Sequence, residues 1–145
     1  MNNKINSIRD FWDGLYKRES ERAISHFEDD AILIWGPYKF EGKDEIQEKW
    51  MEEFFKNFNI NNIIEKNISL DEMGATHEFV LDLKMIYDAR GELSMLAKYD
   101  FKDEKIKKIE VEIYDGHVII KRDDLKFHMP KYQILSMLSS RKKGV

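Results

Sequence analysis

The sequence predicts an α+β protein in which N-terminal helices pack on the concave face of a curved antiparallel sheet. Apolar residues recur at helical spacing up to Phe58, and the pattern changes to alternation from Asn59 onward. Short turns separate the alternating segments, as in an antiparallel meander. The helices must cover the apolar face of this sheet, because nothing else in the chain can cover it.

Composition narrows the classes of function. The chain has 145 residues, which suits one domain, and its net charge of −4 gives no general attraction to nucleic acid or anionic lipid. The absence of cysteine excludes disulfides, thiol nucleophiles and thiolate metal sites. No apolar run is long enough for a signal peptide or a membrane span, so we expect a cytoplasmic location. Basic residues do not cluster with aromatic ones, so no nucleic-acid partner is expected.

Two helices open the chain in this prediction. Apolar residues at spacings of three and four within residues 5–16 mark one face of an amphipathic helix. Gly14 inside this pattern indicates close packing against a neighbour. A shorter helical segment follows over about Glu19 to Phe27, and we interpret Asp29-Asp30 as the turn that ends it.

A strand and a long helix come next. Residues 31–35 form a continuous apolar run, typical of a strand covered on both faces, and Gly36-Pro37 predicts a turn. Residues 43–58 then form the most strongly apolar helix of the chain. Its apolar side chains recur in steps of four at Ile46, Trp50, Phe54 and Phe58.

The second half predicts the sheet. Residues 59–70, 76–87, 93–101 and 108–114 alternate between apolar and polar side chains, with turn sequences between them. The segment 117–127 can prolong this sheet, with Asp123-Asp124 as a further turn. Pro130 can start a helix that carries Tyr132, Leu135 and Leu138.

Four motifs, taken in order, resemble the nuclear-transport-factor-2-like superfamily, which includes SnoaL-like cyclases and ketosteroid isomerase. They are the F-x-D-D-A segment Phe27–Ala31, the helix opening Gly42–Ile46, Lys105-Ile106 at the start of the last meander strand, and Tyr114-Asp115 at its end. The resemblance implies a cystatin-like cone whose interior is either packed or a ligand pocket. It covers residues 5–115 of a single domain spanning residues 1–145, so 116–145 form an extension ending in a short helix.

Catalytic residues of the resembling enzymes do not carry over. Ketosteroid isomerase has a carboxylate base at the end of the first strand, where this chain has Trp35, and a tyrosine where Phe11 or Trp12 falls. Its protonated carboxylic acid corresponds to Met95 or Leu96. That chemistry needs two carboxyl groups with separated pKa values, and neither is present at these positions. The Asp–Arg–Asp set of the related epoxide hydrolases has no counterpart either.

The aromatic residues expected to point into the cone suggest a binding site. They can line a pocket for a small apolar or aromatic ligand, with hydroxyl and indole groups as polar contacts, or they can simply fill the core. The expected lining residues are Trp12, Tyr16, Trp35, Trp50, Phe54, Phe79, Tyr99 and Ile113. No cofactor is expected in this pocket.

An enzyme of the cyclase, isomerase or dehydratase type is the alternative. His77 lies on an apolar strand face and can exchange protons with Tyr16 or Tyr99, because histidine titrates near neutral pH. The simpler interpretation is a histidine at the rim with a backbone partner. His26 is expected to pair with the acidic turn that follows it. The spacing of His117 and His128 fits no ligand set, so no metal site is expected.

The outer face of the sheet mixes charged and apolar side chains. Glu110 and Glu112 are interpreted as cross-strand partners of Lys98 and Asp100. The resemblance favours a homodimer through this face, which carries Val80, Ile86 and Tyr114. A protein–protein adaptor is the second alternative, and it predicts an exposed apolar patch in the segment after Asp115.

Overall fold

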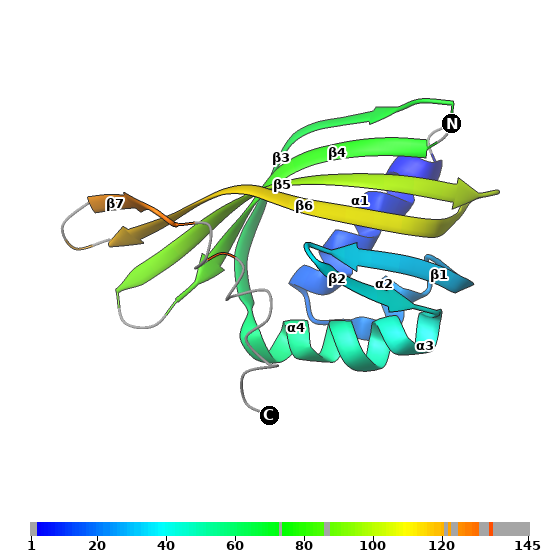
Figure 1. Ribbon diagram of the computed structural model, residues 1–145, viewed down its shortest axis with the longest axis horizontal. Coiled ribbons are helices and arrows are strands. Elements are labelled where there is room, and N and C mark those ends of the chain that lie inside the picture. The colour runs from blue at the N-terminus through cyan, green and yellow to red at the C-terminus, as the bar shows by residue number, and fades with distance from the viewer. Residues whose placement is uncertain are drawn as a thin grey trace.

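A computed structural model describes residues 3–72, 74–85, 88–120, 122, 125–130 and 134. The described residues form a helical layer against a curved seven-stranded sheet (Figure 1). The α+β class and the helices on the concave face therefore agree with the sequence prediction. The helical segments are α1 (Asn3–Tyr16), α2 (Ser20–Ile24), α3 (Lys43–Glu45), the π-helical η1 (Ile46–Met51) and α4 (Glu52–Asn57).

The sheet is mixed rather than antiparallel. Its strands are β1 (Phe27–Trp35), β2 (Tyr38–Glu41), β3 (Asn59–Leu70), β4 (Gly74–Lys84), β5 (Ala89–Lys102), β6 (Lys105–Ile120) and β7 (Leu125–His128). Their order is β2-β1-β6-β5-β4-β3, with β7 also paired to β6. β1 runs parallel to β6, whereas the other described pairs are antiparallel. Alternation within a strand carries no information on the direction of a partner so far along the chain.

Helix α1 packs on the concave face through its apolar stripe. The Trp12 ring centroid lies 4.6 Å from that of Phe79 on β4, and the Phe11 centroid lies 5.2 Å from that of Phe27. A Cβ atom added to Gly14 would lie 3.2 Å from the Cβ of Ala23. The predicted close packing at Gly14 is confirmed, because α2 approaches α1 at this residue.

The long helix predicted over residues 43–58 is one continuous helical segment with a π-helical middle. Steps of four residues advance by about 400° on an α-helix, so an apolar stripe with this spacing drifts around the axis. The wider π turn holds more residues per turn and offsets the drift. Ile46, Trp50, Phe54 and Phe58 are all buried as a result.

The first strand begins earlier than predicted. Phe27 starts β1 instead of ending a helix, and Asp29-Asp30 lie within the strand rather than in a turn. The register with β6 is irregular between Phe27 and Ile32, and both aspartates are exposed there, so their charges stay in water. The predicted Gly36-Pro37 turn is confirmed, and it leads into the short strand β2.

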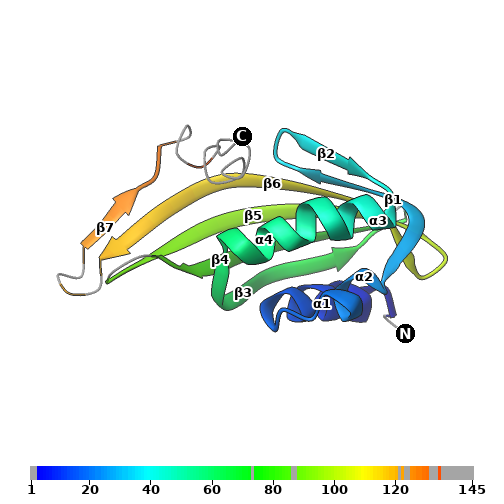
Figure 2. The same ribbon diagram turned by 90° about the horizontal axis from the view of Figure 1, so that it is seen from below.

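The sheet and the core continue past Asp115. β6 extends to Ile120, β7 pairs with its end, and Met129 and Ile134 join the hydrophobic core. Figure 2 shows the long strands running beyond the helices towards β7. Asp123-Asp124, most of the expected C-terminal helix (Tyr132, Leu135 and Leu138 among it) and Ile86 lie outside the described residues. Within the described residues, no helix is long and apolar enough to cross a membrane.

Candidate functional site

The aromatic residues expected to line a pocket mostly pack on one another. Trp35 and Trp50 have ring centroids 5.4 Å apart, and Trp50 and Phe54 have centroids 5.2 Å apart. Six of the eight expected lining residues are at most 4% exposed: Trp12, Trp35, Trp50, Phe54, Phe79 and Tyr99. The centre of the cone is therefore a filled aromatic core.

A cleft of about 220 Å³ lies at the edge of this core, between α1 and the strands β3 and β4. Its α1 wall is Arg9, Trp12, Asp13 and Tyr16, which lie on one helical face because they are spaced by three, one and three residues. Its other wall is Asn62, Ile63, Glu65 and His77. Of the eight residues expected to bind a ligand, only Trp12 and Tyr16 line this cleft.

His77 forms the floor of the cleft. It is 2% exposed, and its partners are side chains rather than the backbone expected for a rim histidine. Nδ1 lies 3.3 Å from the Tyr99 hydroxyl, and Nε2 lies 3.2 Å from Oε1 of Glu65. Tyr16 is 41% exposed at the mouth, whereas Tyr99 is fully enclosed. The structure thus brings His77 and Tyr99 together, and Tyr16 contributes only to the wall.

The hydrogen-bond directions in this group follow from the chemistry of the donors. The Trp12 indole N–H can only donate, and it donates to the Tyr99 hydroxyl at 2.7 Å. The Tyr99 hydroxyl then donates to Nδ1 of His77, which leaves the His77 proton on Nε2 to donate to Glu65. The opposite tautomer would place a bare Nε2 against a carboxylate and leave the buried Tyr99 proton without an acceptor. We call this group the Trp12–Glu65 chain.

Glu65 is held from two sides. Besides the bond from His77, it accepts bonds from Arg9 Nε at 3.2 Å and Arg9 Nη2 at 2.8 Å. These bonds from Arg9 lower the pKa of Glu65, so the carboxylate is ionised at neutral pH. Burial lowers the pKa of His77 and therefore favours its neutral form, although Glu65 acts in the opposite direction. Burial also raises the pKa of Tyr99 strongly, so this hydroxyl stays protonated.

Glu65 and Arg9 are absent from the residues that sequence reasoning selected. The alternation of Ile60, Ile64 and Ile68 suggests that Glu65 faces away from the core. Register irregularities after Ile60 and after Glu65 shift the alternation, so Glu65 lies opposite Phe79 and shares its inward face. Ile64 is consequently 42% exposed. No signal in the sequence marks these irregularities.

The remaining histidines lie elsewhere. His26 pairs with Asp10 on α1 at 2.6 Å, rather than with the acidic residues that follow it. His117 on β6 and His128 on β7 lie opposite each other, and their rings meet edge to face with centroids 5.3 Å apart. Among the described residues, no group of three or more histidine, aspartate or glutamate side chains is arranged to hold a metal ion.

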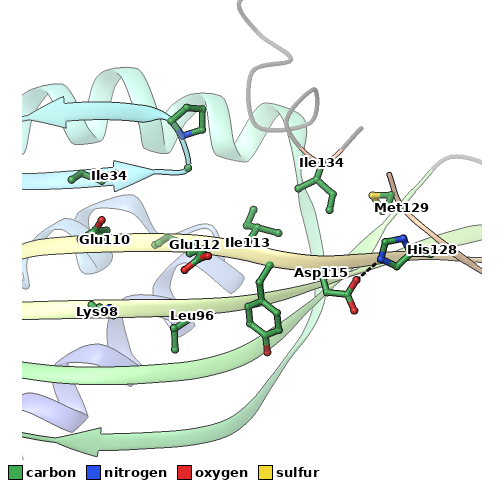
Figure 3. Close-up of a pocket in the computed structure, with 14 residues that line it drawn as sticks. Ile34, Leu96, Lys98, Glu110, Glu112, Ile113, Asp115, His128, Met129 and Ile134 are labelled. Carbon is green, nitrogen blue, oxygen red and sulfur yellow. Dashed lines mark hydrogen bonds and ion pairs between the residues drawn. The ribbon is translucent and has the colours of Figure 1, made fainter. Parts of the chain in front are cut away.

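A second concavity, of about 530 Å³, lies on the outer face of the sheet, and we call it the outer hollow. It is lined by the Gly36-Pro37 turn, by β5 and β6, and by Met129 and Ile134, and Figure 3 shows the labelled side chains around it. It lies beside the part of β6 between two pairings. The pairing of β6 with β1 ends at Val111, and its pairing with β7 begins at His117. Ile113, the remaining member of the expected ligand set, lines this hollow.

The acidic residues of the outer hollow are not paired as expected. Glu110 lies opposite Lys98 in the β5–β6 register, but Glu112 lies opposite Leu96. Among the described residues, neither glutamate has an ion pair within 4 Å. Oδ1 of Asp115 lies within hydrogen-bond distance of His128, 2.7 Å from its Nε2 (Figure 3).

Comparison with known proteins supports the fold. No family model matches the sequence, and no curated protein matches it. Several solved structures are similar. An epoxide hydrolase from Mycobacterium tuberculosis is 13% identical with a TM-score of 0.67, and the match covers 79% of this chain and 84% of that one. An NTF2-like protein of unknown function from Burkholderia pseudomallei is 10% identical with a TM-score of 0.67, and the match covers 79% of this chain and 92% of that one. A protein with a ketosteroid isomerase-like fold from Catenulispora acidiphila, in complex with trimethylamine, is 11% identical with a TM-score of 0.65, and the match covers 73% of this chain and 83% of that one.

These likenesses define the class of protein by its fold. The chain has the nuclear-transport-factor-2-like fold, as its motifs predict. Of the side chains that the resemblance places at the catalytic positions of ketosteroid isomerase, Phe11, Trp12, Trp35 and Met95 are each at most 3% exposed, whereas Leu96, the alternative to Met95, is partly exposed. The fold is shared, and the site of this chain has to be read from its own residues.

Proposed function

We propose that this protein binds a small aromatic or apolar ligand in the cleft between α1 and β3. The observation that carries the proposal is the Trp12–Glu65 chain, in which each buried polar group has a partner and which ends on a partly exposed carboxylate in the cleft. Buried polar chains of this kind hold side chains in one geometry, as a binding site requires. The indole of Trp12 and the ring of Tyr16 supply the apolar walls.

The volume of the cleft limits the size of the ligand. Sites for drug-sized ligands have volumes of roughly 300–1,000 Å³, whereas this cleft has about 220 Å³. A single ring with a short polar arm suits it. The Catenulispora neighbour holds trimethylamine, which supports the view that this fold accommodates small ligands.

A panel of single-ring aromatic compounds tests the proposal. Binding is followed by the shift of the Trp12 indole N–H signal in protein NMR spectra. We expect some members of the panel to shift this signal, and Tyr16→Ala to weaken their binding. Tyr114→Ala is the matched control, because Tyr114 is similarly exposed (48%) but lies on the outer face. A panel that leaves the Trp12 signal unchanged in the wild type contradicts the proposal.

An enzyme acting in the same cleft is the second candidate, and one observation favours it. Glu65 is an ionised carboxylate whose position is held by a neutral histidine, as a general base requires. His77 cannot itself accept a proton from a substrate in this arrangement, because Nδ1 already accepts from Tyr99 and Nε2 carries hydrogen. Tyr99 is enclosed and cannot touch a substrate, so the proton acceptor would be Glu65. Turnover of a compound from the panel, lost in Glu65→Gln, would support this candidate.

We propose a homodimer through the outer face of the sheet. Support comes from the outer hollow, from the exposed ring of Tyr114 and from Leu96 beside it. Sedimentation of the wild type and of a Leu96→Lys variant over a range of concentrations tests this proposal. A wild type that remains monomeric contradicts it.

The adaptor remains a further candidate, because β7 exposes apolar side chains. Leu125 is 46% exposed and Phe127 is 52% exposed. Truncation after Asp115 would remove the end of β6 and, among the described residues, the core side chains Met129 and Ile134, so it would not be a clean test. Comparing the proteins that co-purify with the wild type and with Phe127→Ser is the better one. An unchanged set of partners contradicts the adaptor.

A further inference from the structure

We infer that Glu65 is the group that receives the polar end of the ligand, and that the cleft selects aromatic compounds carrying an ammonium group over neutral or anionic ones. This inference rests on the proposed ligand cleft and adds the chemical class of the ligand. It follows from the hydrogen-bond directions, from the acceptors left open and from the charges of the lining.

The Trp12–Glu65 chain offers the ligand no free group except at its end. The indole N–H of Trp12 is bonded to the hydroxyl of Tyr99, that hydroxyl is enclosed, and both nitrogens of His77 already have partners. A carboxylate has about four acceptor positions, and Glu65 uses two on Oε1 and one on Oε2. The remaining position, on Oε2, is an acceptor and requires a donor from the ligand.

The second carboxylate of the lining also keeps an acceptor. Oδ2 of Asp13 accepts bonds from Arg22 at 2.7 Å and pairs with Lys17 at 3.1 Å. Within the described residues, no hydrogen bond is made to Oδ1 of Asp13. Both carboxylates of the cleft thus have one oxygen open to a donor.

The charges of the lining favour a cation. The lining holds two carboxylates, Asp13 and Glu65, and a single guanidinium, Arg9, while its other residues are neutral. Arg9 already donates two hydrogen bonds to Glu65, so its attraction for an anion is largely offset by that carboxylate. An anionic ligand would meet two carboxylates whose cationic partners are already engaged, Arg9 with Glu65, and Arg22 and Lys17 with Asp13.

The ion pair between Arg9 and Glu65 can also be replaced by a contact with the ligand. Its side chain is 55% exposed, and ion pairs at such positions are screened by water and stabilise little. An ammonium group can therefore replace Nη2 on Oε2 of Glu65 without uncovering a buried charge. The ring of the same ligand would lie against Tyr16 and Trp12, where an adjacent cation is also favoured by the aromatic faces.

Three probes of one shape separate the possibilities: benzylammonium, benzyl alcohol and benzoate. Dissociation constants come from the shift of the Trp12 indole signal on titration at neutral pH. We expect benzylammonium to bind at least about tenfold more tightly than benzyl alcohol, because hydrogen bonds to a charged partner are about twice as strong as neutral ones. Benzoate is expected to bind more weakly than either.

Two isosteric variants complete the experiment. Glu65→Gln keeps an acceptor for His77 but removes the charge, and it should weaken benzylammonium about tenfold while changing benzyl alcohol less than about threefold. Glu92→Gln is the matched control, because Glu92 is paired with Arg90 at 3.0 Å and with Lys126 at 3.3 Å, on the outer face. It should leave all three affinities unchanged.

The outcomes distinguish this inference from the proposed function. If none of the probes binds, the proposed aromatic cleft fails, and the inference fails with it. If benzyl alcohol binds as tightly as benzylammonium, or Glu65→Gln has no effect, the cleft stands and the role of Glu65 is overturned. If benzoate binds most tightly and Arg9→Gln abolishes its binding, the cleft stands and selects anions through Arg9.

Discussion

The larger of the two concavities of this protein is the one whose polar side chains are less buried and less paired. The outer hollow has more than twice the volume of the inner cleft, at about 530 against about 220 Å³. The glutamates of the outer hollow are exposed on the sheet surface, whereas the floor of the inner cleft is a histidine that is 2% exposed. Polar groups that are buried and mutually paired hold a geometry that exposed ones do not. Preorganisation, rather than volume, therefore marks the inner cleft as the candidate binding site.

Adding one methyl group next to Tyr99, which contacts His77 of the inner cleft, and one next to Ile134, which lines the outer hollow, should separate the two regions most clearly. A Cβ at residue 74 would lie 1.7 Å from the backbone carbonyl oxygen of Tyr99, and the backbone would have to move. At residue 116 the added Cβ would meet only the side chains of Ile134 and Leu93, at 3.2 Å. We expect Gly74→Ala to lower the free energy of unfolding by about 3 kcal/mol and Gly116→Ala by about 1 kcal/mol, the ends of the range for overpacking.

Urea denaturation of the two glycine variants measures this difference. Equal losses of stability in both would show that the start of β4 can shift as readily as the side chains around the outer hollow.

Removing one hydroxyl from each region is the next largest test. Tyr99→Phe leaves the Trp12 indole N–H and Nδ1 of His77 without partners inside the core. Tyr114→Phe removes a bond of 2.8 Å to Glu78 at the surface, where water replaces it. We expect losses of about 2–3 kcal/mol for Tyr99→Phe and below about 0.5 kcal/mol for Tyr114→Phe. Chemical denaturation provides the values. A loss of stability in Tyr99→Phe as small as that in Tyr114→Phe would show that the hydrogen bonds of the Trp12–Glu65 chain do not stabilise the core.

The pH dependence of stability should expose His77. Its pKa is lowered in the folded protein, so below the ordinary value of about 6.5 the unfolded chain takes up a proton that the folded chain refuses. Stability is then lost as the pH falls from about 6.5 towards the folded pKa, at up to about 1.4 kcal/mol per pH unit. The lowered pKa of Glu65 adds a further loss only below about pH 4.5.

Thermal denaturation between about pH 5 and pH 7 measures this slope. His77→Gln should flatten it, while Tyr114→Phe, which keeps the buried chain, should retain it. A His77→Gln variant with the wild-type slope would show that another group controls the loss.

Neutralising one glutamate in each region should have the smallest effect on stability. Glu65→Gln keeps the bond from His77 and loses only the ion pair with an exposed arginine, so we expect a loss below about 1 kcal/mol. Glu112→Gln removes a surface charge that has no ion pair among the described residues, and it should change stability by less than about 0.5 kcal/mol. Melting temperatures of the two variants check these values. A large loss in Glu112→Gln would indicate that the outer hollow is a structural site.

The sequence by itself determined the two-layer architecture and most of its elements. The helix over residues 43–58 and the start of β3 at Asn59 are visible in it, because hydrophobic periodicity is a local property of the chain. Six of the eight side chains expected to face into the cone are buried there, whereas Tyr16 lies at the mouth of the cleft and Ile113 lines the outer hollow. Their periodicity is the same for a packed core and for a pocket, so the sequence left that choice open.

Only the tertiary structure decided which side chains form the site. The irregular register of β3 turns Glu65 inward, next to a histidine that comes twelve residues later in the sequence. The parallel pairing of β1 with β6 could not be predicted from the sequence either. Both features depend on pairing between strands, and pairing is set by the packing of the whole sheet rather than by local spacing. A one-residue shift in a strand exchanges its inner and outer faces, and here that shift places the carboxylate in the cleft.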